Sequence, residues 1–198
     1  MKFTSQIGQD QWVCERFNYK RNGYFIEIGA ADGIRISNTY YLEKTLEWTG
    51  ICVEASTELF NQLINNRNCV CINKAIYNKN EIIKFHESDC DGSIRADGEL
   101  TIEAITIKKL IEENNVPKII DYISLDVEGA EYDILTKFPF EEYEVILWTI
   151  EHNSHLDEGE LKAKIRGIMT NNGYAIVPES ISGRILKFED WYINIKYL

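Results

Sequence analysis

Short runs of hydrophobic residues alternate along this chain with stretches whose hydrophobic positions recur at helical spacing. The run at residues 145–150 is almost unbroken, which is typical of a central strand covered on both faces. Runs bounded by turn residues predict the other strands, at residues 24–28, 51–53, 69–72, 82–85, 119–125, 174–177 and 185–188. The pattern therefore predicts a sheet whose strands are separated along the chain by helices.

The segments between the strands carry helix start signals. Ser37 or Asn38, Ser56 and Thr106 stand where an N-cap is expected, because their side-chain oxygens can accept a hydrogen bond from a first-turn amide. Helices are predicted for one segment before residue 24, for residues 37–48, for the segments that begin at Ser56 and Thr106, and for residues 131–135 and about 158–170. Residues 88–100 are predicted to form a polar loop.

This order of elements predicts an α/β domain with a mostly parallel sheet. The last two predicted strands are joined through residues 180–183, a plausible hairpin connection that places one antiparallel strand in the sheet. With 198 residues and no linker-like stretch, we expect a single domain over residues 1–198, whether it is a free protein or was excised from a larger one.

Composition excludes several classes of function. A formal net charge of -11, spread along the chain, argues against binding of nucleic acid or of an anionic membrane through a broad basic surface. The five cysteines include no CxxC pair, which argues against a disulfide framework or a structural zinc site. No apolar run suits a signal peptide or a membrane span, so we expect a cytoplasmic location without membrane insertion. No feature indicates an oligomeric state.

Acidic and polar side chains follow four of the predicted strands. In open α/β sheets, ligands bind at the carboxyl ends of the strands, near the point where the strand order reverses. Each carboxylate could instead stabilise the N-terminus of the following helix. Because four such strand ends belong to one sheet, they predict one pocket, formed by Glu27 and Asp32, Glu54, Asp126 and Glu128, and Glu151 and His152.

The loop after the first strand favours a ribose and disfavours a pyrophosphate. Gly29 and Gly33 are spaced G-x-x-x-G, and Ala31 stands where a dinucleotide fingerprint needs its second glycine. Glu54 follows Gly33 by 21 residues (54 − 33), close to the roughly 20 expected of a ribose-binding acid. The loop is acidic and suits a cationic cofactor that carries ribose hydroxyls.

Several ordered segments resemble the FkbM family of methyltransferases. They are residues 27–33 (EIGAADG), 37–39 (SNT), 42–43, 48–50, 53–54, 120–131 (IDYISLDVEGAE) and 150–153 (IEHN). The resemblance covers roughly residues 6–153. It implies the Rossmann-like class I methyltransferase fold, a seven-stranded sheet with helices on both faces and an antiparallel C-terminal strand. It also implies methyl transfer from S-adenosylmethionine, usually to a hydroxyl oxygen and often on a sugar or glycosylated product.

The same resemblance implies roles in cofactor binding. The loop of Gly29, Ala30, Asp32 and Gly33 would hold the methionine part, and Glu27 or Asp32 would accept its ammonium group. Asn38 would brace this loop or cap a helix, and Glu54 would hold the ribose. Residues 91–94 lie where related enzymes contact adenine, so Ser93 would be a hydrogen-bonding partner and Ile94 an apolar wall. The alternative for that segment is a surface turn.

An alcohol acceptor needs a base or a metal ion to become nucleophilic. Asp126 is the first candidate for positioning the acceptor or for catalysis, and His152 is the most plausible titrating base unless it is a satisfied sheet-edge histidine. Glu128 and Glu131 would face the acceptor or merely start a helix. Alternatively, Asp126, Glu151 and His152 would hold a divalent cation such as Mg²⁺.

The leading hypothesis is therefore an S-adenosylmethionine-dependent O-methyltransferase that acts on a sugar hydroxyl of a glycan or glycoconjugate. One alternative is a methyltransferase-fold module that binds a partner without activity. A nucleotide-sugar or NAD-dependent enzyme is the other, and Ala31 and the acidic loop oppose it.

Overall fold

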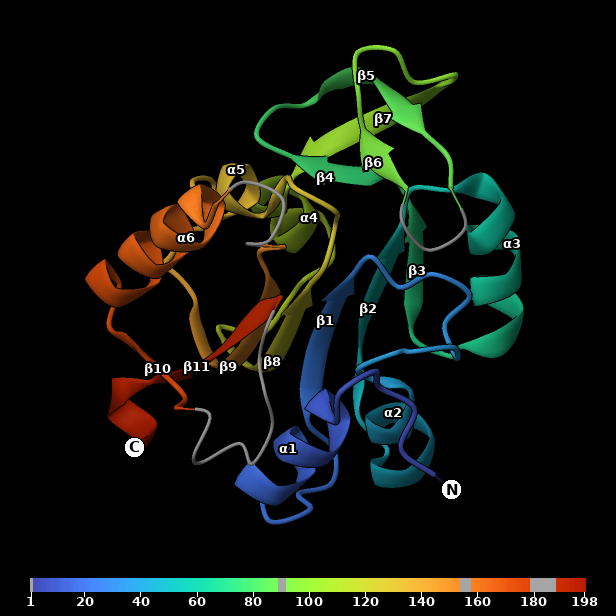
Figure 1. Ribbon diagram of the computed structural model, residues 1–198. Helices are drawn as coiled ribbons and strands as arrows, with labels where there is room; N and C mark the ends of the chain where they lie inside the picture. Colours follow the sequence, from blue (N-terminus) through green and yellow to red (C-terminus); the bar gives the residue numbers. More distant parts are fainter. Residues whose placement is uncertain (1, 89–91, 154–157, 179–187) are drawn as a thin grey trace.

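A seven-stranded sheet forms the centre of the protein in the computed structural model, which describes residues 2–88, 92–153, 158–178 and 188–198. Its strand order is β10-β11-β9-β8-β1-β2-β3 (Figure 1). The strands are β1 (Tyr24–Ile28), β2 (Thr49–Glu54), β3 (Val70–Asn73), β8 (Ile119–Leu125), β9 (Glu144–Glu151), β10 (Tyr174–Ile176) and β11 (Glu189–Asn194). Only β11 runs antiparallel to its neighbours, β9 and β10, so the predicted mostly parallel sheet with an antiparallel C-terminal strand is confirmed.

Helices cover both faces of this sheet. One face packs against α1 (Gln9–Arg16), α2 (Tyr40–Leu46) and α3 (Thr57–Asn66), and the other against α4 (Ile107–Glu113), α5 (Glu131–Leu135) and α6 (Glu160–Asn171). Because side chains alternate along a strand, Leu147 packs on the first face and Trp148 on the second. Burial on both faces explains why β9 is almost wholly apolar.

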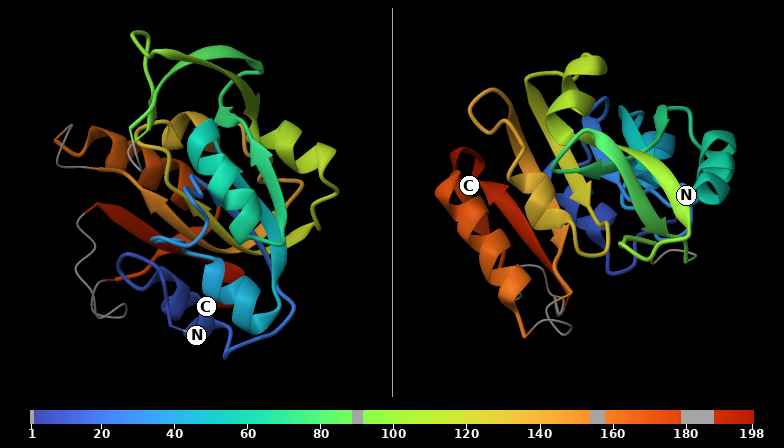
Figure 2. Two further views of the ribbon diagram at one scale, coloured as in Figure 1. Left: turned by 90° about the vertical axis from the view of Figure 1, so that its right-hand side faces the viewer. Right: turned by 90° about the horizontal axis from the view of Figure 1, so that it is seen from above.

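A second, four-stranded sheet lies above the carboxyl ends of β1, β2 and β3 (Figures 1 and 2). It consists of β4 (Ala75–Tyr77), β5 (Glu81–His86), β6 (Ser93–Ile94) and β7 (Leu100–Thr106), in the order β4-β7-β5-β6. Only β5 was predicted, and the predicted loop at residues 88–100 contains β6 and the start of β7. β7 alternates apolar and polar residues from Leu100 to Ala104, a strand signal that the prediction did not use, and its inner residues are buried through pairing with β5 and β4.

The second helix and the C-terminal strand also differ from the prediction. The second helix begins at Tyr40 with Thr39 as its N-cap, so neither Ser37 nor Asn38 caps it. The Ser37 hydroxyl instead accepts hydrogen bonds from the amides of Thr39 and Tyr40 and donates one to Glu27. The antiparallel C-terminal strand is β11 at Glu189–Asn194, which follows the predicted range of 185–188. Residues 180–183 and 185–187 of the predicted hairpin lie outside the described part of the chain.

The predicted caps of α3 and α4 are confirmed. Ser56 Oγ accepts a hydrogen bond from the Leu59 amide at 3.2 Å, and Thr106 Oγ1 accepts one from the Lys109 amide at 3.2 Å. Each bond satisfies one amide that the first helical turn leaves without a partner.

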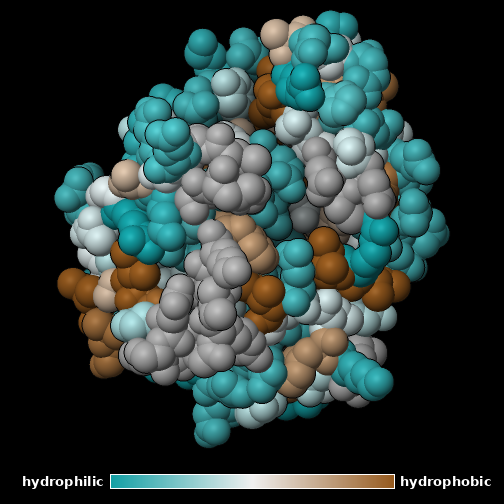
Figure 3. Space-filling view, in the orientation of Figure 1, coloured by the Kyte–Doolittle hydropathy of each residue, from teal (hydrophilic) through white to brown (hydrophobic). Residues whose placement is uncertain are grey.

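The surface agrees with the charged composition. Outside the grey atoms, the face in Figure 3 is mainly hydrophilic, and hydrophobic residues form small separate groups. Among the described residues, none of the helices has the length and apolar character that crossing a bilayer requires.

Candidate functional site

The strand order reverses at β1, which lies between β2 and β8. Gly29, Glu54 and Asp126 stand at the carboxyl ends of these three strands, where ligands of such sheets bind. Gly29 donates to the carbonyl of Val53, and the Asp126 amide donates to the carbonyl of Ile28. Gly29 has φ +85°, and a Cβ atom there would lie 1.8 Å from the Asp126 carbonyl oxygen. Only glycine allows this close approach.

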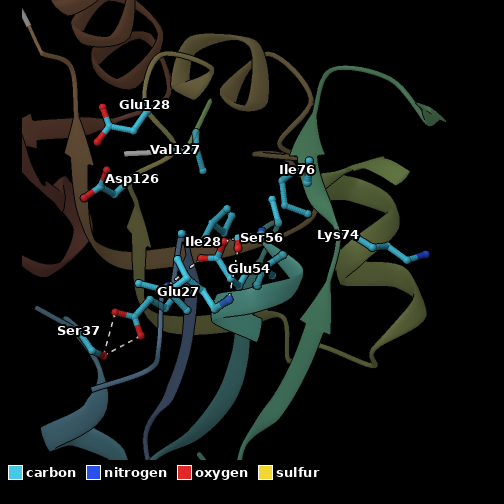
Figure 4. Close-up of a pocket in the computed structure, with 18 of the residues that line it drawn as sticks. Glu27, Ile28, Ser37, Glu54, Ser56, Lys74, Ile76, Asp126, Val127 and Glu128 are labelled. Atoms are coloured by element: carbon cyan, nitrogen blue, oxygen red, sulfur yellow. Dashed lines mark hydrogen bonds between the residues drawn. The ribbon is translucent and has the colours of Figure 1, made fainter. Parts of the chain in front are cut away.

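A cavity of about 830 Å³, counted with its open mouth, begins at these strand ends and extends under the small sheet (Figure 4). Of the residues predicted to bind a cofactor, those that line it are Glu27, Gly29, Ala30, Asn38, Glu54, Ile94 and Asp126. Asp32, Gly33 and Ser93 do not line it. Asp91, from the predicted adenine segment, lies outside the described residues.

Glu54 is held at the cavity wall by backbone amides. Its Oε2 accepts from the Ala31 amide and its Oε1 from the Ser56 amide, both at 2.8 Å (Figure 4). Only 8% of the residue is exposed, and burial raises the pKa of its carboxyl. A carboxylate offers about four acceptor positions, so about two remain for hydroxyl groups in the cavity. This arrangement fits the predicted binding of a ribose.

Glu27 belongs to a buried network that the sequence did not predict. Its carboxylate accepts hydrogen bonds from the Ser37 and Thr39 hydroxyls and from the Asn38 amide, and an ion pair at 3.2 Å joins it to Arg67. The Arg67 side chain is fully buried and also contacts Thr39, Ser37 and the Gly33 carbonyl. A second ion pair, at 2.5 Å, joins it to Glu43. The network supports the cavity loop from behind and occupies both Glu27 oxygens.

Asp32 and Asn38 are the two other polar side chains of this loop, and they differ in whether their oxygen atoms already have hydrogen-bond partners. Asp32 Oδ1 accepts from the amides of Ile34 and Arg35 and so stabilises the turn. Asn38 Nδ2 donates to Ser124 Oγ at 2.8 Å, which ties the loop to β8. Asn38 Oδ1 is buried and has no hydrogen-bond partner among the described residues. An unsatisfied buried acceptor is costly, which favours a ligand or water beside it.

The far wall of the cavity is apolar and comes from the small sheet. Ile94 on β6 pairs with Phe85 on β5, and both line the cavity together with Ile76. Lys74 also lines it, but its ammonium group lies 2.7 Å from Glu103, and the side chain extends away from the acidic residues (Figure 4). An apolar wall opposite Glu54 suits a flat ring attached to a ribose.

Three carboxylates gather at the other end of the cavity. Ligand oxygens of Asp126, Glu128 and Glu151 all lie within 4.8 Å of one another, and Asp126 and Glu128 lie close together in Figure 4. Burial, with the negative charge of Asp126 second, raises the pKa of Glu151 to about 11. Asn153 Nδ2 donates to Glu128 at 3.0 Å and to Glu151 at 2.8 Å. Glu151 therefore keeps its proton at neutral pH.

His152 lies apart from this carboxylate group, which corrects the predicted set of cation ligands. His152 Nε2 is 3.8 Å from Asp190 on β11, and Asp190 is held by Arg166 at 2.6 and 2.8 Å. Within the described residues, the group with the spacing of a cation site consists of Asp126, Glu151 and Glu128. The local sequence order placed His152 beside Glu151, but β9 ends at Glu151, and the His152 side chain lies against Asp190 of β11.

A second cavity adjoins the first. The described residues that line it are Glu128, Gly129, His152, Asn153, Glu160, Leu161 and Lys164. Glu128 lines both cavities. Lys164 pairs with Glu160 at 2.6 Å, so its charge is balanced within the wall. The Asp126–Glu128 turn therefore separates two neighbouring binding spaces.

Glu131 holds this turn in place rather than facing a cavity. Its Oε1 accepts from the amides of Val127 and Gly129, at 3.0 and 3.1 Å. Only 1% of the residue is exposed. Burial raises the pKa of its carboxyl from 4.5 to about 7, although the backbone hydrogen bonds oppose the rise.

This pKa predicts a pH dependence of stability. Because the folded-state pKa is raised, the protonated carboxyl favours folding fully below pH 4.5, and this contribution is lost as the pH rises through about 7. Glu131→Gln keeps an oxygen for both amides and never ionises. We expect the unfolding free energy of the wild type to fall by about 3 kcal/mol relative to Glu131→Gln over this range. Urea unfolding at several pH values measures it, and parallel pH profiles would contradict it.

Comparisons with known proteins agree with this geometry. The family model described as "Methyltransferase FkbM domain" matches residues 27–176. No curated protein matches the chain. Among solved structures, a precorrin-6y C5,15-methyltransferase from Geobacter metallireducens GS-15 is similar with a TM-score of 0.52 and 8% identity, over 93% of this chain and 85% of that one.

Two further structures support the same fold. A METTL16 MTase domain has a TM-score of 0.51 and 10% identity, over 92% of this chain and 64% of that one. A human methyltransferase 10 domain containing protein has a TM-score of 0.50 and 10% identity, over 93% of this chain and 78% of that one. The fold is thus the class I fold of S-adenosylmethionine-dependent methyltransferases, and the match over residues 27–176 shows that the chain belongs to the FkbM methyltransferase family.

Proposed function

We propose that the chain methylates a hydroxyl oxygen of a sugar in a glycan or glycoconjugate, with S-adenosylmethionine as the methyl donor. The observation that carries the proposal is the pair of cavities that meet at Glu128. When bound, the sulfonium group of the cofactor supplies an electrophilic methyl group. A donor in one cavity and an acceptor in the other would face each other across the Asp126–Glu128 turn. Such alignment can contribute about 7–11 kcal/mol to lowering the barrier.

The first cavity offers a group for each part of the cofactor. Glu54 would accept the ribose hydroxyls, and Phe85 and Ile94 would cover the adenine. Glu27 was one predicted acceptor of the ammonium group, but Arg67 and the loop already occupy its oxygens. Asn38 and Asp126 line the cavity and are better placed for this role.

The second cavity supports a hydroxyl-rich acceptor. Its described wall contains carboxylates, an amide and a histidine, which can bond to sugar hydroxyls, and within that wall Leu161 is the one apolar side chain. The pairing of Lys164 with Glu160 leaves no excess positive charge there for phosphate groups. This charge distribution favours a neutral sugar over a nucleic acid.

Glu128 is the group we assign as general base. It lines both cavities, and Asn153 positions its carboxylate, whereas Glu151 holds a proton and His152 lies against Asp190. General-base catalysis contributes about 10²–10⁴-fold to a rate. We expect Glu128→Gln to lower kcat at least about 100-fold while the affinity for S-adenosylhomocysteine changes little. Steady-state kinetics with calorimetry measures both values; a normal kcat would exclude this role, and His152→Ala tests the other candidate.

The three carboxylates are also oxygen donors of the kind that Mg²⁺ prefers. Exhaustive chelation with EDTA separates this use from direct proton transfer. Activity that is lost and then restored by Mg²⁺ supports a metal-assisted reaction, whereas unchanged activity supports Glu128 alone.

Calorimetric titration with S-adenosylhomocysteine tests the proposed function first. We expect binding by the wild type and at least tenfold weaker binding by Glu54→Ala, because each lost hydrogen bond to a charged group costs about 1.5–3 kcal/mol. A glycan library incubated with labelled cofactor then identifies the acceptor by mass spectrometry. Absence of binding would reject the proposal, and binding without any methylated product would favour a module that has lost catalysis.

A further inference from the structure

A pair of thiols lies directly behind the cofactor loop. Cys52 on β2 stands beside Glu27 of β1 in the strand register, and its Sγ donates to Glu27 Oε2 at 3.7 Å. Cys69, which precedes β3, has its Sγ 3.5 Å from Cys52 Sγ. Cys52 is fully buried, whereas Cys69 is partly exposed. The pair therefore connects the surface with the carboxylate that organises the loop.

The surroundings of the two sulfur atoms make Cys69 the member of the pair that an oxidant meets first. Cys69 Sγ donates to Cys52 Sγ, which donates to Glu27, so Cys69 is the partly exposed end of this chain of hydrogen bonds. The Arg67 charge favours its thiolate. Burial raises the pKa of Cys52. Partly exposed thiolates next to a cation react with peroxides, and a nearby second thiol can then resolve the product. The geometry supplies both members of such a pair.

We propose that Cys52 and Cys69 form a site of reversible oxidation, and that a disulfide between them weakens cofactor binding. With hydrogen peroxide as oxidant, the Cys69 thiolate attacks one oxygen, which gives a sulfenic acid and releases hydroxide. The Cys52 thiol then attacks the Cys69 sulfur, the S–S bond forms, and the sulfenic oxygen leaves as water with the Cys52 proton. Two electrons pass from the two sulfur atoms to the peroxide. A dithiol reverses the reaction by thiol–disulfide exchange.

The link to the cofactor site runs through Glu27. A disulfide needs a sulfur–sulfur distance of about 2.05 Å, so the two side chains must approach by about 1.5 Å. Cys52 then loses the proton that it donates to Glu27. Glu27 in turn holds the Asn38 amide and Arg67, and Arg67 holds the Gly33 carbonyl. The effect on affinity rests on the proposed function, whereas formation of the disulfide does not.

The experiment treats the full chain with hydrogen peroxide and maps its peptides by mass spectrometry. We expect a cross-link between Cys52 and Cys69 with loss of two hydrogen atoms, reversed by dithiothreitol. Cys52→Ser and Cys69→Ser should abolish the cross-link. Cys71→Ser is the matched control, because Cys71 is also partly exposed and lies two residues from Cys69, and it should still form the cross-link. A bond that joins other cysteines, or oxidation without any cross-link, would overturn the proposal.

Two readouts test the coupling to the loop. Calorimetry should show at least threefold weaker binding of S-adenosylhomocysteine by the oxidised protein, and Cys69→Ser should show no change after peroxide. Hydrogen exchange should become faster at the Asn38 amide of the oxidised protein, and this readout needs no ligand. A cross-linked protein with unchanged exchange there would overturn the coupling. If the reduced protein failed to bind S-adenosylhomocysteine, the proposed function would fail, while the cross-link and the exchange would still decide this inference.

Discussion

Gly29→Ala is expected to abolish measurable binding of S-adenosylhomocysteine and to lower the free energy of unfolding by about 3 kcal/mol or more. The added Cβ would lie 1.8 Å from the Asp126 carbonyl oxygen, so β1 and β8 must separate at the point where the cofactor cavity begins. The left-handed φ of +85° adds a cost of about 1–2 kcal/mol. Urea unfolding and calorimetry measure the two effects.

Gly159→Ala is the matched control for backbone strain. Gly159 has φ +86°, and no heavy atom of the described residues lies within 4 Å of the point that a Cβ atom would occupy there. We expect a loss of about 1–2 kcal/mol and unchanged cofactor affinity. Equal effects of the two substitutions would show that φ alone, rather than the contact with Asp126, makes Gly29 necessary.

Arg67→Met is expected to lower the free energy of unfolding by about 3–5 kcal/mol. The substitution fills a similar volume but leaves the buried carboxylates of Glu27 and Glu43 without their common cation. The loop also loses its bonds to the Gly33 carbonyl and the Thr39 hydroxyl, so cofactor affinity should fall by at least tenfold. Thermal and urea unfolding report the first effect, and calorimetry with S-adenosylhomocysteine reports the second.

Two comparisons make this prediction specific. Arg21→Met removes an exposed ion pair with Glu47, for which we expect a change below about 1 kcal/mol. Adding Glu27→Gln to Arg67→Met should recover part of the lost stability, because the buried charge of Glu27 is then removed, whereas Glu43 keeps its ion pair with Lys44 at 3.0 Å. If Glu27→Gln alone weakened cofactor binding without loss of stability, Glu27 would contact the ammonium group after all.

The apolar strands of the large sheet were predictable because each is a local run of hydrophobic residues. β1, β8 and α5 have the predicted bounds, since strong hydrophobic runs and a turn signal mark them locally. The small sheet was mostly missed. Its strands β4 and β6 are only three and two residues long, and residues such as Ile83 and Ala104 of the longer strands are buried through the pairing of β5 with β7. Pairing between strands leaves little trace in the local sequence.

In the candidate site, too, residues in local motifs could be predicted, whereas contacts between distant segments could not. Gly29, Glu54 and Asp126 could be proposed because strand ends of a parallel sheet meet at one edge, and the structure places them there. Arg67 was missed, since it lies 40 residues from Glu27 and follows a helix with no motif around it. A buried arginine close to two buried acids becomes visible only when distant segments are packed together.

The sequence by itself determined the fold class, the family resemblance and the strand ends that carry the site, because hydrophobic periodicity and short motifs act over a few residues. Only the tertiary structure decided which side chains each carboxylate meets. It assigned Glu27 to Arg67, grouped Glu128 with Asp126 and Glu151, and placed His152 beside Asp190. The physical reason is that charge pairing and burial depend on distances in space between residues that are far apart along the chain.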